Sequence, residues 1–202
     1  MIEIIDVEQG SPEWFKARVG LPTASRFSDI LAKGEGKTRA RYMRDLAAEI
    51  IRGAPEEETY TNAHLERGKA QEDDARRMYA FMHDAEPQRV GFIKNGRKGC
   101  SPDSLIGEKG GLEIKCALGA IQIERLMKGV CPSEHVAQVQ GSLWVTDREW
   151  WDFCSYSPGL PLFVARVYRD EPYLATLRDA VDGFLGELDE LVEKVRRYGG
   201  AT

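Results

Sequence analysis

Three residues near the middle of the chain are spaced so that their side chains could act together. Asp103 follows Ser101-Pro102, and Glu113 and Lys115 stand ten and twelve residues further on. Side chains alternate between the faces of a β-strand, so Glu113 and Lys115 would share one face of a strand over residues 111–116. If Asp103 reaches the same side, two carboxylates and one ammonium group lie beside each other.

Such a group could bind a divalent metal and act on a phosphate. Hard cations such as Mg²⁺ prefer carboxylate and carbonyl oxygens, which Asp103, Glu113 and the backbone of Ile114 would supply. Lys115 would then position an attacking water and stabilise charge on the phosphate. A polar strand face is also common on half-solvated sheets, and this spacing arises by chance in many proteins. A metal site and a solvated strand face are therefore both open at this point.

The local patterns predict an α/β fold in a single domain over residues 1–202. We expect a central hairpin of strands 97–100 and 111–116, joined by residues 104–110, with Asp103 at its mouth. Further helices are predicted over residues 39–52, 62–83, 119–128, 133–145 and 172–197, and further strands over 89–94, 150–157 and 163–168.

The composition is that of an ordinary globular chain. The 202 residues carry a net charge of −5, and no apolar run approaches the length of a membrane-spanning helix. We therefore expect a cytoplasmic protein without a membrane partner. Five basic residues lie from Lys33 to Arg44, whereas Asp179–Glu193 carries six acids and no base. This polarity fits a basic channel and a separate acidic exterior, with a solvated basic face as the alternative.

Two helices each carry one polar residue of interest. Glu72 is the only charge on the inward face of the helix over 62–83, and a buried carboxylate needs either a metal or a salt bridge, here to Lys69 or Arg76. Gln138 could hold a water or a phosphate oxygen near a metal, although a lone glutamine is often just exposed. The inward face of the first helix is expected to consist of Leu65, Gly68, Glu72, Ala75, Tyr79 and Met82.

The N-terminal segment could bind a phosphate. Ser11-Pro12 predicts a helix start, because the hydroxyl can cap the helix and proline fits its first turn. Thr23 could cap a second helix, with Arg18 and Ser25 nearby. Backbone amides and a hydroxyl at a helix start, beside an arginine, suit a phosphate. The alternative is a capped helix with a surface arginine.

Other residues are expected to be structural. Cys100, Cys116, Cys131 and Cys154 lack the close spacing of zinc or iron–sulfur ligands and are predicted to be reduced thiols. His135 belongs to no zinc-site pattern. A hydrophobic stripe on the last helix is expected to pack on the domain's own sheet, with a subunit contact as the alternative. The stripe consists of Leu174, Leu177, Val181, Phe184, Leu188, Leu191 and Val195.

Taken together, five blocks of sequence resemble the bacteriophage lambda exonuclease family, also called YqaJ-like viral recombinases, of the PD-(D/E)xK nuclease superfamily. The blocks run in order through most of the chain, which is far more specific than the spacing of the two acids and the lysine alone. They are Trp14…Arg18-Val19-Gly20…Thr23-Ala24-Ser25, Gly68-Lys69-x-x-Glu72-x-Asp74-Ala75, Cys100-Ser101-Pro102-Asp103-x-Leu105, Gly111-Leu112-Glu113-Ile114-Lys115-Cys116 and Ala137-Gln138-Val139-Gln140-x-Ser142-x-Trp144-Val145-Thr146.

The resemblance implies a restriction-endonuclease-like core, in which a central mixed β-sheet is flanked by helices. It implies a Mg²⁺-dependent, processive exonuclease that degrades one strand of linear double-stranded DNA from the 5′ end. The 3′ single-stranded overhang would pass to a single-strand annealing protein in recombination. Two Mg²⁺ ions are expected, with Mn²⁺ as a substitute, and family members form homotrimer rings that encircle DNA.

The same resemblance gives roles to individual residues. Lys115 would orient or activate the attacking water, and Gln138 would assist near it. Arg18 and Ser25 match a pocket for the 5′-phosphate. The metal site would be formed by Asp103, Glu113, the carbonyl of Ile114 and Glu72, while Leu65 matches a residue that wedges apart the terminal base pair and Lys37 matches a phosphate contact. His135 stands where the family has a tyrosine and receives no role.

Two rival functions are open. The same fold could serve a PD-(D/E)xK endonuclease, such as a restriction or junction-cleaving enzyme, which would cut closed circular DNA. The chain could also be a DNA-binding subunit whose metal site has decayed. Intact acidic residues and Lys115 argue against decay.

Overall fold

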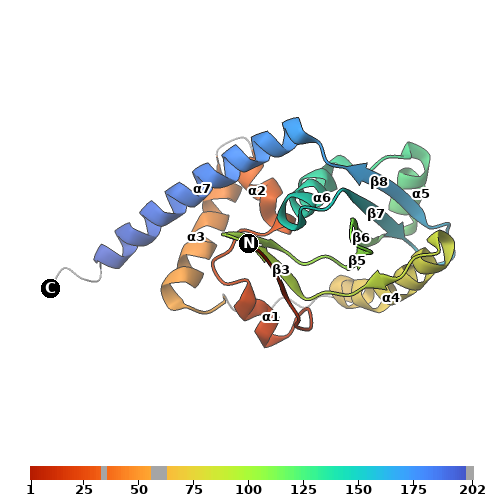
Figure 1. Cartoon of the computed structure of the whole chain (residues 1–202), viewed down its shortest axis with the longest axis horizontal. Coiled ribbons are helices and arrows are strands. Elements are labelled where there is room, and N and C mark those ends of the chain that lie inside the picture. The colour runs from red at the N-terminus through yellow and green to blue at the C-terminus, as the bar shows by residue number, and fades with distance from the viewer. Residues whose placement is uncertain (33–35, 56–62, 199–202) are drawn as a thin grey trace.

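In the computed structural model of this chain, residues 1–32, 36–55 and 63–198 are described, with residues 63–70 described by their backbone alone. A sheet flanked by helices forms one part of the molecule, and the long C-terminal helix runs over further helices at the other (Figure 1). The helices are α1 (Pro12–Ala17), α2 (Phe27–Leu31), α3 (Lys37–Arg52), α4 (Ala63–His83), α5 (Gly119–Lys128), α6 (Ser133–Thr146) and α7 (Glu171–Tyr198). The strands are β1 (Ile2–Ile5), β2 (Pro87–Gln88), β3 (Phe92–Asn95), β4 (Lys98–Cys100), β5 (Ser104–Ile106), β6 (Gly110–Cys116), β7 (Trp150–Tyr156) and β8 (Phe163–Tyr168).

The main sheet is mixed. Within the described residues it has five strands in the order β2-β5-β6-β7-β8, beside a smaller sheet of three strands in the order β1-β3-β4. β6 and β7 run parallel, whereas the other pairs in the main sheet are antiparallel. Parallel neighbours need a long crossover, and here α5 and α6 supply it. The predicted α/β architecture with a central mixed sheet flanked by helices is confirmed.

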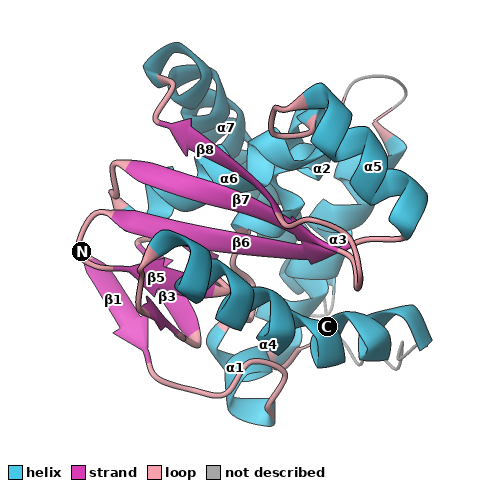
Figure 2. Cartoon of the chain, turned by 90° about the vertical axis from the view of Figure 1, so that its right-hand side faces the viewer, coloured by secondary structure: helices cyan, strands magenta, loops and turns pink. Residues whose placement is uncertain are grey.

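The two faces of β6 pack against different helices (Figure 2). Leu112 and Ile114 point toward α4, where they form a hydrophobic cluster with Ala75 and Tyr79. The opposite face, which carries Glu113, is covered by α6. Because both faces are buried, the side chains of β6 project from a rigid position.

The central hairpin differs from the prediction, which was wrong about its first strand. β4 pairs with β3 in the smaller sheet, and β6 pairs with β5, which lies inside the segment expected to be a loop. Gly96 and Gly107 both have a positive φ, so tight turns join β3 to β4 and β5 to β6. These short turns cost less loop-closure entropy than the predicted longer connection. Asp103 therefore lies where the chain leaves one sheet and enters the other.

Several local predictions are confirmed and several are corrected. Ser11 caps α1, since its Oγ accepts a hydrogen bond of 3.2 Å from the Trp14 amide. Thr23 makes no such cap with its side chain. On α4, Tyr79 is buried as expected, but Met82, in the last turn of the helix, is 57% exposed. The strand expected over residues 89–94 begins only at Phe92, in β3, and neither β1 nor β2 was predicted.

The hydrophobic stripe of α7 is buried against helices rather than the sheet. Its residues from Leu174 to Leu188 are buried, but the stripe continues at Val192, and Val195 is exposed. α7 packs on α2, α3 and α6, because α6 already covers this face of the sheet. Among the described residues, no helix is long and apolar enough to cross a membrane. All four cysteines are free thiols, as predicted.

Close packing at the crossing of α6 with the turn before α2 leads to a stability prediction. A methyl group at Gly141 would overlap the ring of buried Phe27 and lie 3.2 Å from the Cβ of Ala24. We expect Gly141→Ala to lower the free energy of unfolding by about 1–3 kcal/mol. Gly183→Ala is the matched control, because this exposed α7 position has open space around it and alanine should stabilise the helix by up to about 1 kcal/mol. Urea denaturation of both variants measures the difference, and equal stabilities would contradict the packing.

Candidate active site

The structure brings Asp103, Glu113 and Lys115 together. Lys115 Nζ lies 2.6 Å from Glu113 Oε1, and both side chains project from the same face of β6. The Asp103 carboxylate accepts a hydrogen bond from the backbone amide of Ile114. Asp103 lies beside Glu113 and Lys115 because its carboxylate bonds to the backbone of β6. The pairing of β4 with β6 that the sequence predicted plays no part in this.

Gln138 completes the burial of Glu113. Its Nε2 donates a hydrogen bond of 2.6 Å to Glu113 Oε1, the same oxygen that Lys115 contacts. Glu113 is 3% exposed, and a carboxylate at that depth is stable only when its oxygens are paired. The amide predicted to stand near the site therefore lies in it and fixes one carboxylate oxygen.

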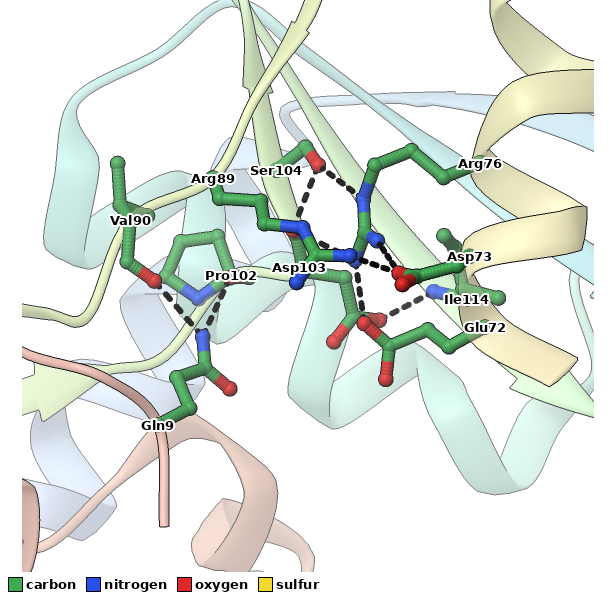
Figure 3. Close-up of polar contacts among 10 residues, drawn as sticks. All are labelled: Gln9, Glu72, Asp73, Arg76, Arg89, Val90, Pro102, Asp103, Ser104 and Ile114. Carbon is green, nitrogen blue, oxygen red and sulfur yellow. Dashed lines mark hydrogen bonds and ion pairs between the residues drawn. The ribbon is translucent and has the colours of Figure 1, made fainter. Parts of the chain in front are cut away.

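Glu72 is held beside Asp103 by an arginine (Figure 3). Arg76 Nη2 contacts Glu72 Oε1 and lies 3.3 Å from the backbone oxygen of Asp103, and Arg76 Nε donates to Ser104 Oγ at 3.0 Å. Arg76 Nη1 also donates to Asp73 Oδ1 at 2.6 Å. The buried guanidinium thus joins α4 to the start of β5, and Glu72 has the salt bridge that stood as the alternative to metal binding.

The carboxylates of this cluster repel one another. Burial raises the pKa of Asp103 well above its usual range, and the negative charges of Glu113 and Glu72 raise it further. Burial lowers the pKa of Lys115, but the charges of Glu113 and Asp103 outweigh this effect and raise it overall. Lys115 is therefore a stable ammonium group, and the site has excess negative charge that a cation would neutralise.

The oxygen donors suit Mg²⁺ better than a soft metal. Asp103 and Glu113 supply two carboxylates next to the backbone of Ile114, and Glu72 has one oxygen that does not contact Arg76. Within the described part of the chain, no three His, Cys, Asp or Glu side chains are arranged so that together they could hold a metal ion. Mg²⁺ keeps several waters and needs only one or two carboxylates, so this donor set fits it.

The N-terminal segment lies beside the strand that leads into Asp103. Trp14 Nε1 donates a hydrogen bond of 2.9 Å to Ser101 Oγ, and the Arg18 guanidinium carbon lies 3.8 Å from the Trp14 ring centroid. Thr23 forms an isolated parallel bridge with Gly99 in β4. These contacts put Arg18 near the segment that carries Ser101 and Asp103, which sequence spacing alone could not show.

The remaining predicted DNA contacts are distributed around this segment. Ser25 is exposed, and its Oγ lies 3.3 Å from Thr23 Oγ1. Lys37 is exposed at the first position of α3. Leu65, the predicted wedge, has a side chain that lies outside the described residues.

The basic run and the acidic helix are not fully separate, contrary to the prediction. Arg39 in α3 donates to both carboxylate oxygens of Glu187 in α7, at 2.7 and 2.8 Å. Arg97 makes a similar pair with Asp189. The basic and acidic segments meet because α3 and α7 pack against each other in the tertiary structure.

Sequence reasoning missed two supports of the site. Arg76 was considered only as a partner of Glu72, yet it also binds Ser104 and the backbone of Asp103. Its place four residues after Glu72, on the same helix face, was the available signal. Trp14 carried no signal of its contact with Ser101, because the two residues are distant in the sequence and meet only in the fold.

Known proteins are similar to this chain in sequence. A model of the YqaJ-like viral recombinase domain matches residues 13–149. The uncharacterized protein ExoD of Escherichia coli (strain K12) is 33% identical over 66 residues, which are 31% of this chain and 76% of that protein.

Solved structures match over a longer range. LHK-Exo, an alkaline exonuclease from Laribacter hongkongensis, is 34% identical, with a TM-score of 0.86 over 94% of this chain and 98% of that chain. Its complex with dAMP gives a TM-score of 0.87 over the same shares. A phage-related exonuclease from Haemophilus somnus 129PT shares the fold at 14% identity, with a TM-score of 0.68 over 87% and 96% of the two chains. With its PD-(D/E)xK-type fold, this chain belongs to the family of YqaJ-like viral recombinase domains, as a nuclease of the lambda exonuclease type.

Proposed function

We propose that this nuclease is a Mg²⁺-dependent exonuclease that hydrolyses one strand of linear double-stranded DNA from the 5′ end and leaves 3′ single-stranded overhangs. The observation that carries the proposal is the cluster of Asp103, Glu113 and Lys115, with Gln138 bonded to Glu113 and Glu72 beside it. This cluster lies in a chain that is similar to an alkaline exonuclease over nearly its whole length.

Each side chain has a task in phosphodiester hydrolysis. Asp103, Glu113, the Ile114 carbonyl and Glu72 would hold up to two Mg²⁺ ions, and Mn²⁺ accepts the same oxygen ligands. When bound, Mg²⁺ would lower the pKa of a water molecule and stabilise charge on the phosphate. Lys115 would orient that water and donate to a phosphate oxygen, while Gln138 would keep Glu113 in place and contact the water.

DNA would be held largely through its backbone. Arg18 and Ser25 would bind the 5′-phosphate, because a guanidinium and a hydroxyl both donate hydrogen bonds to phosphate oxygens. Lys37 would contact a phosphate further along the duplex, and Leu65 would separate the terminal base pair. Binding of this kind is insensitive to sequence and weakens with salt.

The wider setting follows from the same resemblance. Residues 1–202 would form a single exonuclease domain, and three copies would form a ring around the duplex, which would make digestion processive. A single-strand annealing protein would take up the 3′ overhang in recombination. An enzyme that acts on DNA ends would work in the cytoplasm of a bacterial or phage-infected cell.

A linear duplex with different labels at its 5′ and 3′ ends tests the activity and its direction. We expect the 5′ label to be lost only with Mg²⁺ and 3′ overhangs to grow with time, while a closed circular DNA stays intact. Nicked circles would support an endonuclease instead. Binding of both DNAs without cleavage of either would support a DNA-binding subunit.

Replacement of the lysine tests the catalytic cluster. We expect Lys115→Ala to reduce the cleavage rate at least about 100-fold, since a positioned proton donor or charge contributes about that much or more. Duplex binding measured without Mg²⁺ should persist. Lys109→Ala is the control, because Lys109 is exposed in the β5–β6 turn and pairs with Glu149. Wild-type rates in Lys115→Ala would remove this residue from the mechanism.

Replacement of Arg18 tests the 5′-phosphate pocket. Loss of a charge-assisted hydrogen bond costs about 1.5–3 kcal/mol, so Arg18→Ala should slow digestion of 5′-phosphorylated ends at least about tenfold more than that of 5′-hydroxyl ends. Lys16→Ala, at an exposed position of α1 two residues before Arg18, should change neither rate. The pocket is wrong if Arg18→Ala slows both kinds of end equally.

A further inference from the structure

The catalytic face of the sheet extends onto the next strand. In the parallel register, Glu113 lies opposite Phe153 and Lys115 lies opposite Ser155. Residues opposite each other on neighbouring strands point to the same face, and the strands are about 4.8 Å apart. Phe153 and Ser155 thus lie next to the catalytic residues, one strand further from Asp103.

Arg125 of α5 covers these two residues. Its Nη1 donates a hydrogen bond of 2.9 Å to Ser155 Oγ, and its guanidinium carbon lies 5.3 Å from the Phe153 ring centroid. Its Nη2 lies 3.1 Å from Nε2 of His135, whose ring stacks on Phe153 at 4.9 Å between centroids. Contacts from β7 and from α6 therefore fix the guanidinium beside β6.

The two hydrogen-bond partners of Arg125 carry no negative charge. Burial lowers the pKa of His135 to about 4, and the charges of Lys115 and Arg125 act in the same direction, so His135 is neutral at physiological pH and accepts from Arg125. Ser155 Oγ donates to Gln122 Oε1 at 2.6 Å and accepts from Arg125. Among the described residues, no carboxylate lies within ion-pair distance of Arg125, and the negative charges of Glu134 and Glu124 act on it from further away.

The guanidinium also has donors to spare. An arginine has five N–H groups, and in the described part of the chain Arg125 uses two of them, on Ser155 and His135. The side chain is half-buried, so the others remain within reach of a ligand. A planar guanidinium with free donors and no acidic partner is well suited to a phosphate group.

We propose that Arg125 binds a phosphate of the DNA strand next to the scissile phosphate, and that His135 is a positioning residue for it. The proposal rests on the proposed exonuclease function. It gives a role to His135, which fits no metal-site pattern. His135 stacks on Phe153 and accepts a hydrogen bond from Arg125, and it would thereby hold the guanidinium beside β6. Lys115 would contact the scissile phosphate, and Arg125 would set the position of the strand beside it.

The salt dependence of DNA binding tests this contact. Binding of a 5′-phosphorylated duplex is measured without divalent metal at several salt concentrations for the wild type, Arg125→Gln and Lys128→Gln. Loss of one phosphate contact should weaken binding about tenfold and reduce the slope of log K against log salt by about one. Lys128 is the matched control, because it lies on the same helix, is exposed and pairs with Glu124.

The outcomes separate the two proposals. If the wild type digests linear duplex and only Arg125→Gln has the smaller slope, the contact is supported. Equal slopes in wild type and Arg125→Gln, or an equal decrease in Lys128→Gln, would overturn it while the exonuclease function stands. Failure of the wild type to act on DNA would overturn both.

A measurement on the wild type guards against misfolding of the variant. Phenylglyoxal modifies accessible arginines, and modification of Arg125 is followed by mass spectrometry with and without the duplex. Protection of Arg125 by DNA is expected, and an unchanged rate of modification would overturn the proposal. His135→Gln should partly retain DNA affinity, because glutamine can also accept a hydrogen bond from Arg125, whereas His135→Ala should lose more.

Discussion

The burial of neighbouring carboxylates is the constraint on which the site depends. Glu113 is almost fully buried, and Asp103 and Glu72 lie close enough for their charges to raise the pKa of Asp103. Carboxylates crowded in this way are destabilising unless cations and hydrogen-bond donors offset their charge. Lys115 and Arg76 supply that charge, and Arg76 also connects α4 to the start of β5. The ion pairs that offset the carboxylate charges in the folded protein therefore also hold the side chains of the site in place.

The sheet gives these charges a rigid base. β6 is covered by α4 on one face and by α6 on the other, and its parallel partner β7 continues the polar face toward Arg125. Each helix delivers one polar group to this platform: Glu72 from α4, Gln138 from α6 and Arg125 from α5. A site built on packed strands and helices keeps its geometry better than one built on loops.

The N-terminal segment reaches the same region by a different route. The hydrogen bond from Trp14 to Ser101 and the bridge between Thr23 and Gly99 attach this segment to the strand before Asp103. Arg18, which stacks on Trp14, is thereby brought near the cluster although it is far from it in sequence. The proposed 5′-phosphate pocket would thus lie beside the short chain segment that carries Ser101 and leads into Asp103.

The sequence by itself determined the residue types of the cluster, the helices with strong periodicity and the family. Alternation along one strand was enough to put Glu113 and Lys115 on the same face, because that relation is local. The sequence could not determine which strand pairs with β6, since β5 has too few residues to show a pattern. Tight turns at Gly96 and Gly107 decided this pairing. Only the tertiary structure brought Arg76 to the backbone of Asp103 and Arg125 to Ser155, because such contacts depend on how separate elements pack.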